Sequence, residues 1–203
     1  MEVVNKGGHD MKRKMLFIRP PSLEMGDVAK TRNIHYGTIP YGVLSIIAYV
    51  NKYKKNDVDL DILDLNIQPW GNYEDDEFDR KVSDYISAYQ PDIVGISVMY
   101  NHIYPFINRL SRIAKQINSD TIVIAGGACI MAYYQQILRE CKNIDAICFS
   151  EGEIPVLNLV NSENMYDILE NDVSFLTKNG LVNGKKPQAA FVDDLDDIPL
   201  VNF

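Results

Sequence analysis

Cysteine is scarce in this sequence: the 203 residues include three, Cys129, Cys141 and Cys148. Their number is odd, and their spacing matches neither a zinc finger nor a redox pair. We therefore expect reduced, mostly buried thiols in a cytoplasmic protein. The sequence shows no signal peptide and no apolar run long enough to cross a membrane, so we expect no membrane association.

Two further absences narrow the function. The chain has no excess of basic residues: its net charge is −8, which argues against general binding to nucleic acid. It also contains no G-x-x-x-x-G-K-[ST] phosphate loop, no G-x-G-x-x-G after the first apolar run, and no G-x-S-x-G nucleophile elbow. A hydrolase or a nucleotide-dependent transferase is therefore disfavoured.

What the sequence does contain is a regular alternation of strand-like and helix-like segments. Stretches with helical spacing of apolar residues separate five short, β-branched runs. Strands that alternate with helices form parallel sheets through right-handed crossovers. We therefore predict an α/β fold with a doubly wound, parallel five-stranded sheet in the order 2-1-3-4-5, flavodoxin-like or Rossmann-like. The expected strands are Met15–Arg19, Val58–Asp64, Ile93–Val98, Thr121–Ala125 and Asp145–Phe149, and the expected helices cover 42–55, 74–89, 103–118, 130–141 and 155–160.

The chain divides into three parts. Residues 1–13 are polar and contain glycine, so we expect a flexible lead. Residues 14–162 form the sheet domain. Within 163–203 we expect a small hairpin, in which Ser174–Thr177 and Leu181-Val182 flank a glycine-containing turn, and then an acidic, extended connector.

The carboxyl ends of the first, third and fourth strands carry residues that we expect to bind a ligand. Open parallel sheets bind ligands at this edge, where the strand order reverses. Small residues there leave room for a ligand, and the segment that opens the first long helix offers further N–H donors. The candidates are Pro20 after the first strand, Thr38, Tyr41 and Gly42 at the helix start, Ser97, Val98 and Met99 at the third strand, and Gly126 and Gly127 at the fourth.

Three features in or near these strand ends have two possible interpretations. Gly126-Gly127 either lets a large ligand approach the backbone or serves a tight turn and close helix packing. Arg19, at the end of the first strand, either faces a phosphate or forms a salt bridge. His35, in the loop after that strand, is either a metal ligand or a hydrogen-bonding surface residue, and no acidic or cysteine residue is spaced to join it.

In their order along the chain, these motifs resemble the N-terminal cobalamin (vitamin B12)-binding domain of radical S-adenosylmethionine (SAM) enzymes. The similarity covers nearly the whole chain from Lys14 onward. No single motif is specific, but the ordered set is. The set comprises Pro20-Pro21, Pro40-Tyr41-Gly42-Val43-Leu44, Gln90–Ser97, Val123–Gly127, Ser150-Glu151-Gly152-Glu153 and Asp193–Pro199.

The resemblance implies a cobalamin site in the groove between the first and third strands, where the family holds the nucleotide tail of the cofactor. Met99 stands in place of leucine in the family's Ser-x-Leu element, and Ser150 in place of the first glycine of its Gly-Glu-Gly-Glu signature. For Glu153 we expect a helix-start role, stabilised by the helix dipole. The implied cofactor-binding residues are Pro20, Thr38, Tyr41, Gly42, Ser97, Val98, Met99, Gly126, Gly127 and Glu151.

Two departures from the family pattern shape this expectation. The wider class uses Asp-x-His-x-x-Gly to place an imidazole on cobalt, but around His35 the aspartate is missing and the spacing differs. We therefore expect base-off cobalamin without a histidine ligand, and His35 remains the alternative. The family's Cys-x-x-x-Cys-x-x-Cys motif is also absent, so a [4Fe-4S] cluster and S-adenosylmethionine are implied for a parent enzyme only.

The sequence therefore predicts the cobalamin-binding domain of a radical SAM enzyme, a fragment that is not catalytic by itself. The acidic Leu-Asp-x-Ile-Pro connector reaches the end of the chain where the radical barrel would follow, and that C-terminal barrel of the same polypeptide is the expected partner. The parent would perform methyl transfer or a related radical modification. The alternative is a flavodoxin-like interaction or regulatory module that has lost its cofactor.

Overall fold

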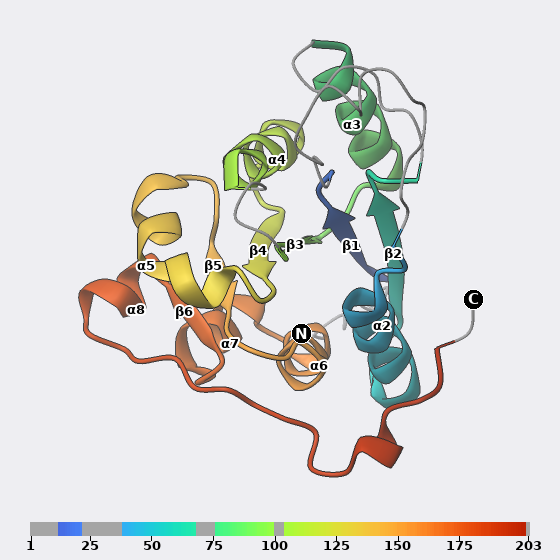
Figure 1. Ribbon diagram of the computed structural model, residues 1–203, viewed down its shortest axis with the longest axis vertical. Helices are drawn as coiled ribbons and strands as arrows, with labels where there is room; N and C mark the ends of the chain where they lie inside the picture. The colour runs from blue at the N-terminus through green and yellow to red at the C-terminus, as the bar shows by residue number, and fades with distance from the viewer. Residues whose placement is uncertain (1–11, 22–37, 68–75, 100–103, 202–203) are drawn as a thin grey trace, which may run out of the picture.

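The computed structural model of the chain describes residues 12–21, 38–67, 76–99 and 104–201 (Figure 1). In these ranges six strands form one sheet in the order β2-β1-β3-β4-β5-β6. Strands β1 to β5 are parallel, and β6 pairs antiparallel with β5. The strands are β1 (Arg13–Arg19), β2 (Val58–Asp64), β3 (Ile93–Ser97), β4 (Ile122–Gly126), β5 (Ala146–Cys148) and β6 (Phe175–Thr177).

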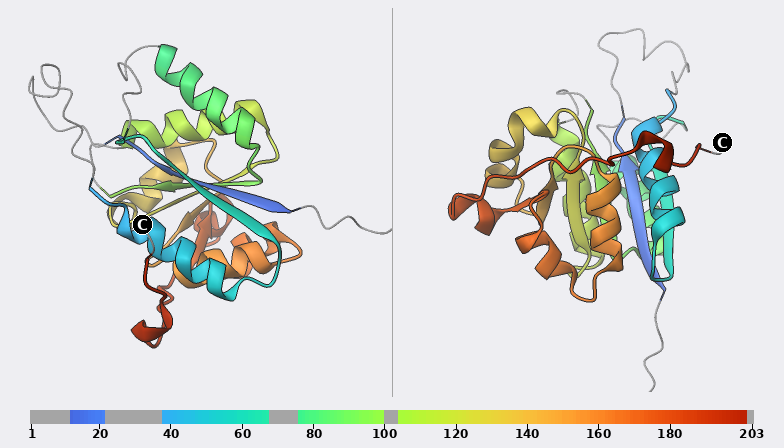
Figure 2. Two further views of the ribbon diagram at one scale, coloured as in Figure 1. Left: turned by 90° about the vertical axis from the view of Figure 1, so that its right-hand side faces the viewer. Right: turned by 90° about the horizontal axis from the view of Figure 1, so that it is seen from below.

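Helices cover both faces of this sheet, as the left view in Figure 2 shows. One face packs against α3 (Asp76–Tyr89), α4 (Tyr104–Ile117) and α5 (Ile130–Glu140). The other packs against α2 (Tyr41–Tyr53), α6 (Glu153–Asn161) and α7 (Met165–Asn171).

The alternation of side chains along each strand separates the two hydrophobic cores. In β1, Leu16 and Ile18 lie in the core under α3, α4 and α5, whereas Met15 and Phe17 lie in the core under α2 and α6. Successive residues of a strand point to opposite faces, and a strand buried on both faces is therefore apolar throughout. This is why the sequence shows continuous apolar runs here.

The predicted strand order 2-1-3-4-5 is confirmed, but the predicted C-terminal hairpin is wrong. Phe175–Thr177 are buried and extend the main sheet beyond β5. Lys178–Val182, which includes the expected turn and return strand, forms the short helix α8. The Thr177 hydroxyl accepts a hydrogen bond from the Gly180 N–H at 2.9 Å, so the residues expected to make a turn instead make the first turn of a capped helix.

The acidic tail returns to the first long helix. Its 3₁₀-helix η2 (Leu195–Asp197) begins where the Asp194 carboxylate accepts a hydrogen bond from the Asp196 N–H at 3.0 Å. Lys52 Nζ and the Tyr53 hydroxyl, both on α2, donate to the Asp197 carbonyl at 2.9 and 3.2 Å. The tail therefore contacts side chains from the last turn of α2.

The buried cysteines agree with the expectation from composition. Cys129, Cys141 and Cys148 are all free thiols and all buried. Among the helices of the described ranges, none combines the length and the apolar composition needed to cross a bilayer.

Ser150, two residues after β5, offers a test of the backbone conformation. Ser150 has a φ of 73°, in the left-handed region where a Cβ is unfavourable. Glycine carries no such penalty, so we expect Ser150→Gly to raise the free energy of unfolding by about 1 kcal/mol. Ser150→Ala keeps the Cβ and should bring no gain. Urea unfolding of both variants checks this, and a glycine variant no more stable than wild type would contradict it.

Candidate functional site

A pocket of about 530 Å³ opens at the carboxyl edge of the sheet, between the first turns of α2 and α6. Its floor comes from strand residues that face α2 and α6, because they alternate with the residues of the opposite core: Phe17, Gly95, Ile124 and Cys148. The pocket lies over β1 and β3, where the strand order reverses. Its volume falls within the roughly 300–1,000 Å³ usual for small-molecule sites.

Nearly all the cofactor-binding residues predicted from the sequence line this one pocket. They come from distant segments: the ends of β1, β3 and β4, the start of α2 and the loop after β5. The lining includes Pro20, Thr38, Tyr41, Gly42, Ser97, Met99, Gly126, Gly127 and Glu151. Their convergence is a fact of the fold, whereas their contact with a cofactor remains a prediction.

Val98 is the exception among the predicted residues. Its side chain is fully buried in the core under α3, α4 and α5 and does not line the pocket. Its backbone has a different role: the N–H donates to the Gly126 carbonyl at 2.7 Å, and the carbonyl accepts from the Cys129 N–H at 3.1 Å. Val98 therefore joins the ends of β3 and β4 and offers no side chain to a ligand.

The two glycines at the end of β4 differ in what the backbone requires of them. Gly127 has a φ of 111°, and a Cβ there would lie 2.6 Å from the Val98 carbonyl oxygen, so it serves the tight turn. Gly126 lines the pocket, and a Cβ there would meet only the Cβ and carbonyl oxygen of Cys148, at an ordinary 3.5 Å. Gly126 is thus free of the steric requirement that fixes Gly127.

The mouth of the pocket is open and apolar. Gly42 lines it, and a Cβ at that position would meet no heavy atom within 4 Å. Around it lie four large apolar side chains of the pocket lining that are at least one-third exposed: Ile39, Tyr41, Met99 and Met131. Exposed apolar side chains that line a pocket are suited to contact with an apolar group of a ligand.

The floor is apolar as well, and Cys148 belongs to it. Burial raises the pKa of the Cys148 thiol to about 12, and the nearby carboxylates of Asp172, Glu153 and Glu151 act in the same direction. The thiol therefore stays protonated at neutral pH. A protonated, buried cysteine behaves as a small hydrophobic residue and not as a nucleophile or metal ligand.

Arg19 forms a salt bridge, which settles the second open question. Its Nη1 lies 2.9 Å from Asp64 Oδ2, and the two side chains are 11% and 3% exposed. The same guanidinium donates to the carbonyl and the hydroxyl of Thr38. Arg19 also lines the pocket, with its charge already paired to Asp64.

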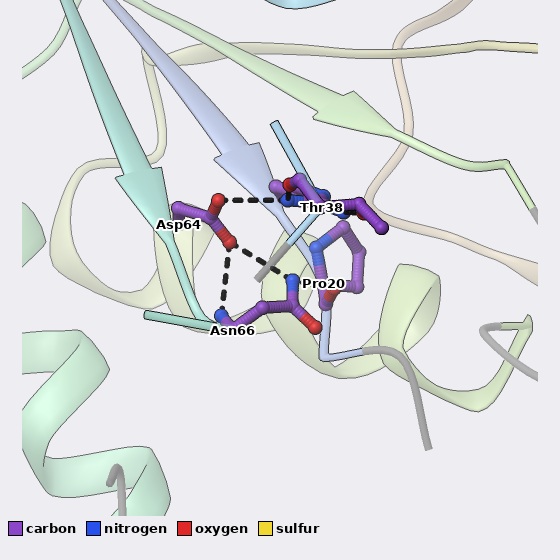
Figure 3. Close-up of polar contacts among 5 residues, drawn as sticks. Pro20, Thr38, Asp64 and Asn66 are labelled. Atoms are coloured by element: carbon purple, nitrogen blue, oxygen red, sulfur yellow. Dashed lines mark hydrogen bonds and ion pairs between the residues drawn. The ribbon is translucent and has the colours of Figure 1, made fainter. Parts of the chain in front are cut away.

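The partner of Arg19 belongs to a buried polar network, shown in Figure 3. Asp64 Oδ1 accepts hydrogen bonds from both the N–H and the side-chain amide of Asn66, each at 2.9 Å. That amide also donates to the Pro20 carbonyl at 3.0 Å. The network therefore joins the ends of β1 and β2 to Thr38, which precedes α2. Thr38 also lines the pocket.

The sequence reasoning assigned Glu153 only a helix-start role, but the structure also places it in the pocket. Glu153 lies in the first turn of α6, lines the pocket and is 7% exposed. Its Oε1 accepts a hydrogen bond from the Ser45 hydroxyl of α2 at 2.6 Å. The acidic signature at 150–153 drew attention to Glu151 instead. The contact between Glu153 and Ser45 becomes visible only once α2 and α6 are packed together.

In the described ranges, no cluster of three or more histidine, cysteine, aspartate or glutamate side chains is placed to hold a metal ion. His35 lies outside the described residues. Cobalamin without a histidine ligand to cobalt therefore stays a prediction, with His35 as the alternative ligand.

Comparison with known proteins identifies the type of domain. A model of the B12 binding domain family matches residues 30–160. The uncharacterized methyltransferase PH0819 of Pyrococcus horikoshii is 28% identical over 191 residues, which cover 94% of this chain. The anaerobic magnesium-protoporphyrin IX monomethyl ester cyclase of Rubrivivax gelatinosus is 32% identical over 123 residues, or 58% of the chain.

A third relative is the cytidylyl-2-hydroxyethylphosphonate methyltransferase of Streptomyces wedmorensis, 24% identical over 80% of the chain. The alignments cover 38%, 22% and 35% of these three curated relatives. The chain thus corresponds to a minor part of each.

The different roles of the two glycines predict different effects of alanine. Gly127→Ala places a Cβ against the Val98 carbonyl in a left-handed conformation, so we expect it to lower the free energy of unfolding by roughly 1–3 kcal/mol. Gly126→Ala meets only ordinary contacts and should change it by no more than about 1 kcal/mol. Denaturant unfolding of the pair checks the contrast, and equal losses would contradict it.

The buried network predicts a large effect for Asp64→Ala, which leaves the Arg19 guanidinium without its carboxylate. Removal of one partner of a buried pair costs about 3–5 kcal/mol, and we expect a loss of that order. Asp84→Ala is the control, because its pair with Arg80 is exposed and worth less than about 1 kcal/mol. Thermal unfolding compares the two, and an Asp64→Ala variant as stable as Asp84→Ala would refute the role of the network.

Proposed function

The chain belongs to the B12-binding domain family, and we propose that its pocket holds the nucleotide tail of cobalamin. With the tail in the pocket, the nucleotide base is removed from cobalt, which is the base-off form. We propose further that the chain is the cobalamin-binding part of a cytoplasmic radical SAM enzyme that performs methyl transfer or a related modification.

One observation carries the proposal: the residues that match the family's motifs, although they are scattered from Pro20 to Glu151, line a single pocket at the switch point of the sheet. Doubly wound folds place ligands at this point. Because fold alone does not decide function, the composition of the pocket matters as much as its position.

The residues of the pocket fit the tail of cobalamin. An apolar floor of Phe17, Ile124 and Cys148 suits a flat, hydrophobic base, and Gly126 leaves room against it. Ser97, which is paired in register with Gly126, offers a hydroxyl beside that floor. Bound cobalamin would supply a cobalt centre for group transfer, while the chain's own residues bind and orient it and exclude water.

The nature of the parent enzyme rests on the relatives. Two of the three are named methyltransferases and the third a cyclase, and all are longer than this chain. We propose that a C-terminal radical SAM domain, with its [4Fe-4S] cluster and S-adenosylmethionine, follows the acidic connector. These two cofactors belong to that domain and not to the pocket.

Titration with hydroxocobalamin tests the function. We expect a shift in the absorption spectrum and one cobalamin retained per chain on gel filtration. Gly126→Leu, which fills the pocket from its floor, should weaken binding at least tenfold. Ser87→Leu is the control, because Ser87 is exposed on α3, on the opposite face of the sheet.

Both variants are first checked for an unchanged thermal transition. Wild-type chain that retains no cobalamin at high micromolar concentration would contradict the proposal and favour the interaction module. Equal binding by Gly126→Leu and Ser87→Leu would place the cofactor elsewhere.

A further inference from the structure

We propose that Glu153 recognises the sugar of the bound cofactor's nucleotide tail by accepting a hydrogen bond from a ribose hydroxyl. This inference rests on the cobalamin-binding function proposed above and deepens it, because it assigns a specificity-determining residue to the same pocket.

The starting point is the burial of a carboxylate beside an apolar floor. Glu153 is 7% exposed, and its neighbours in the pocket lining include Ile46, Cys148 and Val156. A buried carboxylate requires hydrogen bonds to offset the loss of hydration. Its position in the first turn of α6 supplies part of this, since the positive end of the helix dipole favours negative charge.

Only part of the hydrogen-bonding capacity of Glu153 is used. Oε1 accepts from the Ser45 hydroxyl at 2.6 Å. Within the part of the chain that the structure describes, Oε2 accepts no hydrogen bond, and neither oxygen forms an ion pair. An ionised carboxylate has about four acceptor positions, so Glu153 keeps unused acceptor capacity in a pocket built for a ligand.

The charge on Glu153 restricts what the ligand can present. A carboxylate attracts donors and repels anions. Arg19, a cation of the pocket lining, is already paired with Asp64 and does not neutralise Glu153. Glu153 also contributes to the raised pKa of Cys148, so its field reaches the pocket floor. A ligand group beside Glu153 must therefore be a hydrogen-bond donor.

The nucleotide tail of cobalamin has few such donors. Its dimethylbenzimidazole base carries no N–H or hydroxyl group, and its phosphate is an anion that Glu153 repels. Besides the amide N–H of the linker between the phosphate and the corrin, the donors of the tail are the ribose hydroxyls, and the ribose is attached directly to the base. The chemistry of the pocket thus assigns the base to the apolar floor and the sugar to Glu153, with Ser45 holding the carboxylate in place.

The test compares two pieces of the tail that differ only in the sugar. The probes are α-ribazole, which is the riboside, and 5,6-dimethylbenzimidazole, which is the free base. Both are titrated at millimolar concentration into the 15N-labelled chain, and dissociation constants come from the amide shifts. We expect α-ribazole to bind about tenfold more tightly than the base, as a hydrogen bond to a charged acceptor allows.

Three variants locate the effect. Glu153→Ala should remove the advantage of α-ribazole while leaving the affinity for the free base unchanged. Glu153→Gln keeps an oxygen but lacks the charge, so it should retain part of the advantage. Glu163→Gln is the control: Glu163 is exposed just beyond the end of α6, and its neutralisation should change neither affinity.

The outcomes separate this inference from the proposed function. Failure of the wild-type chain to bind hydroxocobalamin overturns both. If hydroxocobalamin binds but α-ribazole has no advantage over the base, the function stands and the role of Glu153 is overturned. Equal loss of affinity for both probes in Glu153→Ala would assign Glu153 a structural role and also overturn it.

Discussion

The pocket depends on the way the ends of β3 and β4 are held together. The Val98 N–H donates to the Gly126 carbonyl, and the Val98 carbonyl accepts from the Cys129 N–H. Gly127 passes close beside the Val98 carbonyl. Only a residue without a Cβ allows that approach, and it must also adopt a φ of 111°. This contact keeps Ser97 and Gly126 in register, so that both face α2 and α6.

The opposite wall depends on a second, electrostatic constraint. Arg19 and Asp64 end adjacent strands, in register with each other, and are nearly excluded from water. A buried pair of this kind is stable only when its remaining donors and acceptors are also satisfied. Thr38 accepts from Arg19 and Asn66 donates to Asp64, while the Asn66 amide also donates to the Pro20 carbonyl. The pocket is thus bounded by backbone packing on one side and by a charged network on the other. Its interior is left for apolar contact and for the carboxylate of Glu153.

The sequence predicted what depends on local pattern and missed what depends on packing. Five β-branched runs separated by helices were enough to predict the sheet order, and residues at strand ends were enough to predict most of the pocket lining. Phe175–Thr177 form a short antiparallel strand because β5 offers them a buried edge, and no local pattern reveals that. Likewise, Glu153 meets Ser45 only because α2 and α6 lie side by side. For Arg19 the sequence left two interpretations, a phosphate ligand or a salt bridge. Its salt-bridge partner, Asp64, lies 45 residues away in the sequence, so no local pattern reveals the pair.

The substitution of serine for the first glycine of the family's acidic signature does not put the pocket in doubt. Ser150 adopts the left-handed conformation that explains why glycine is favoured at that point, with a φ of 73°. The chain after β5 therefore still turns toward Glu151, Gly152 and the start of α6, and all three segments line the pocket. At Gly152 the backbone of this turn packs closely against α2, since a Cβ there would lie 2.4 Å from the Ile46 side chain. The close approach of α6 to α2 brings Glu153 within hydrogen-bond distance of Ser45. The backbone conformation at 150–152 therefore positions the carboxylate of the site, although Ser150 replaces the glycine of the signature.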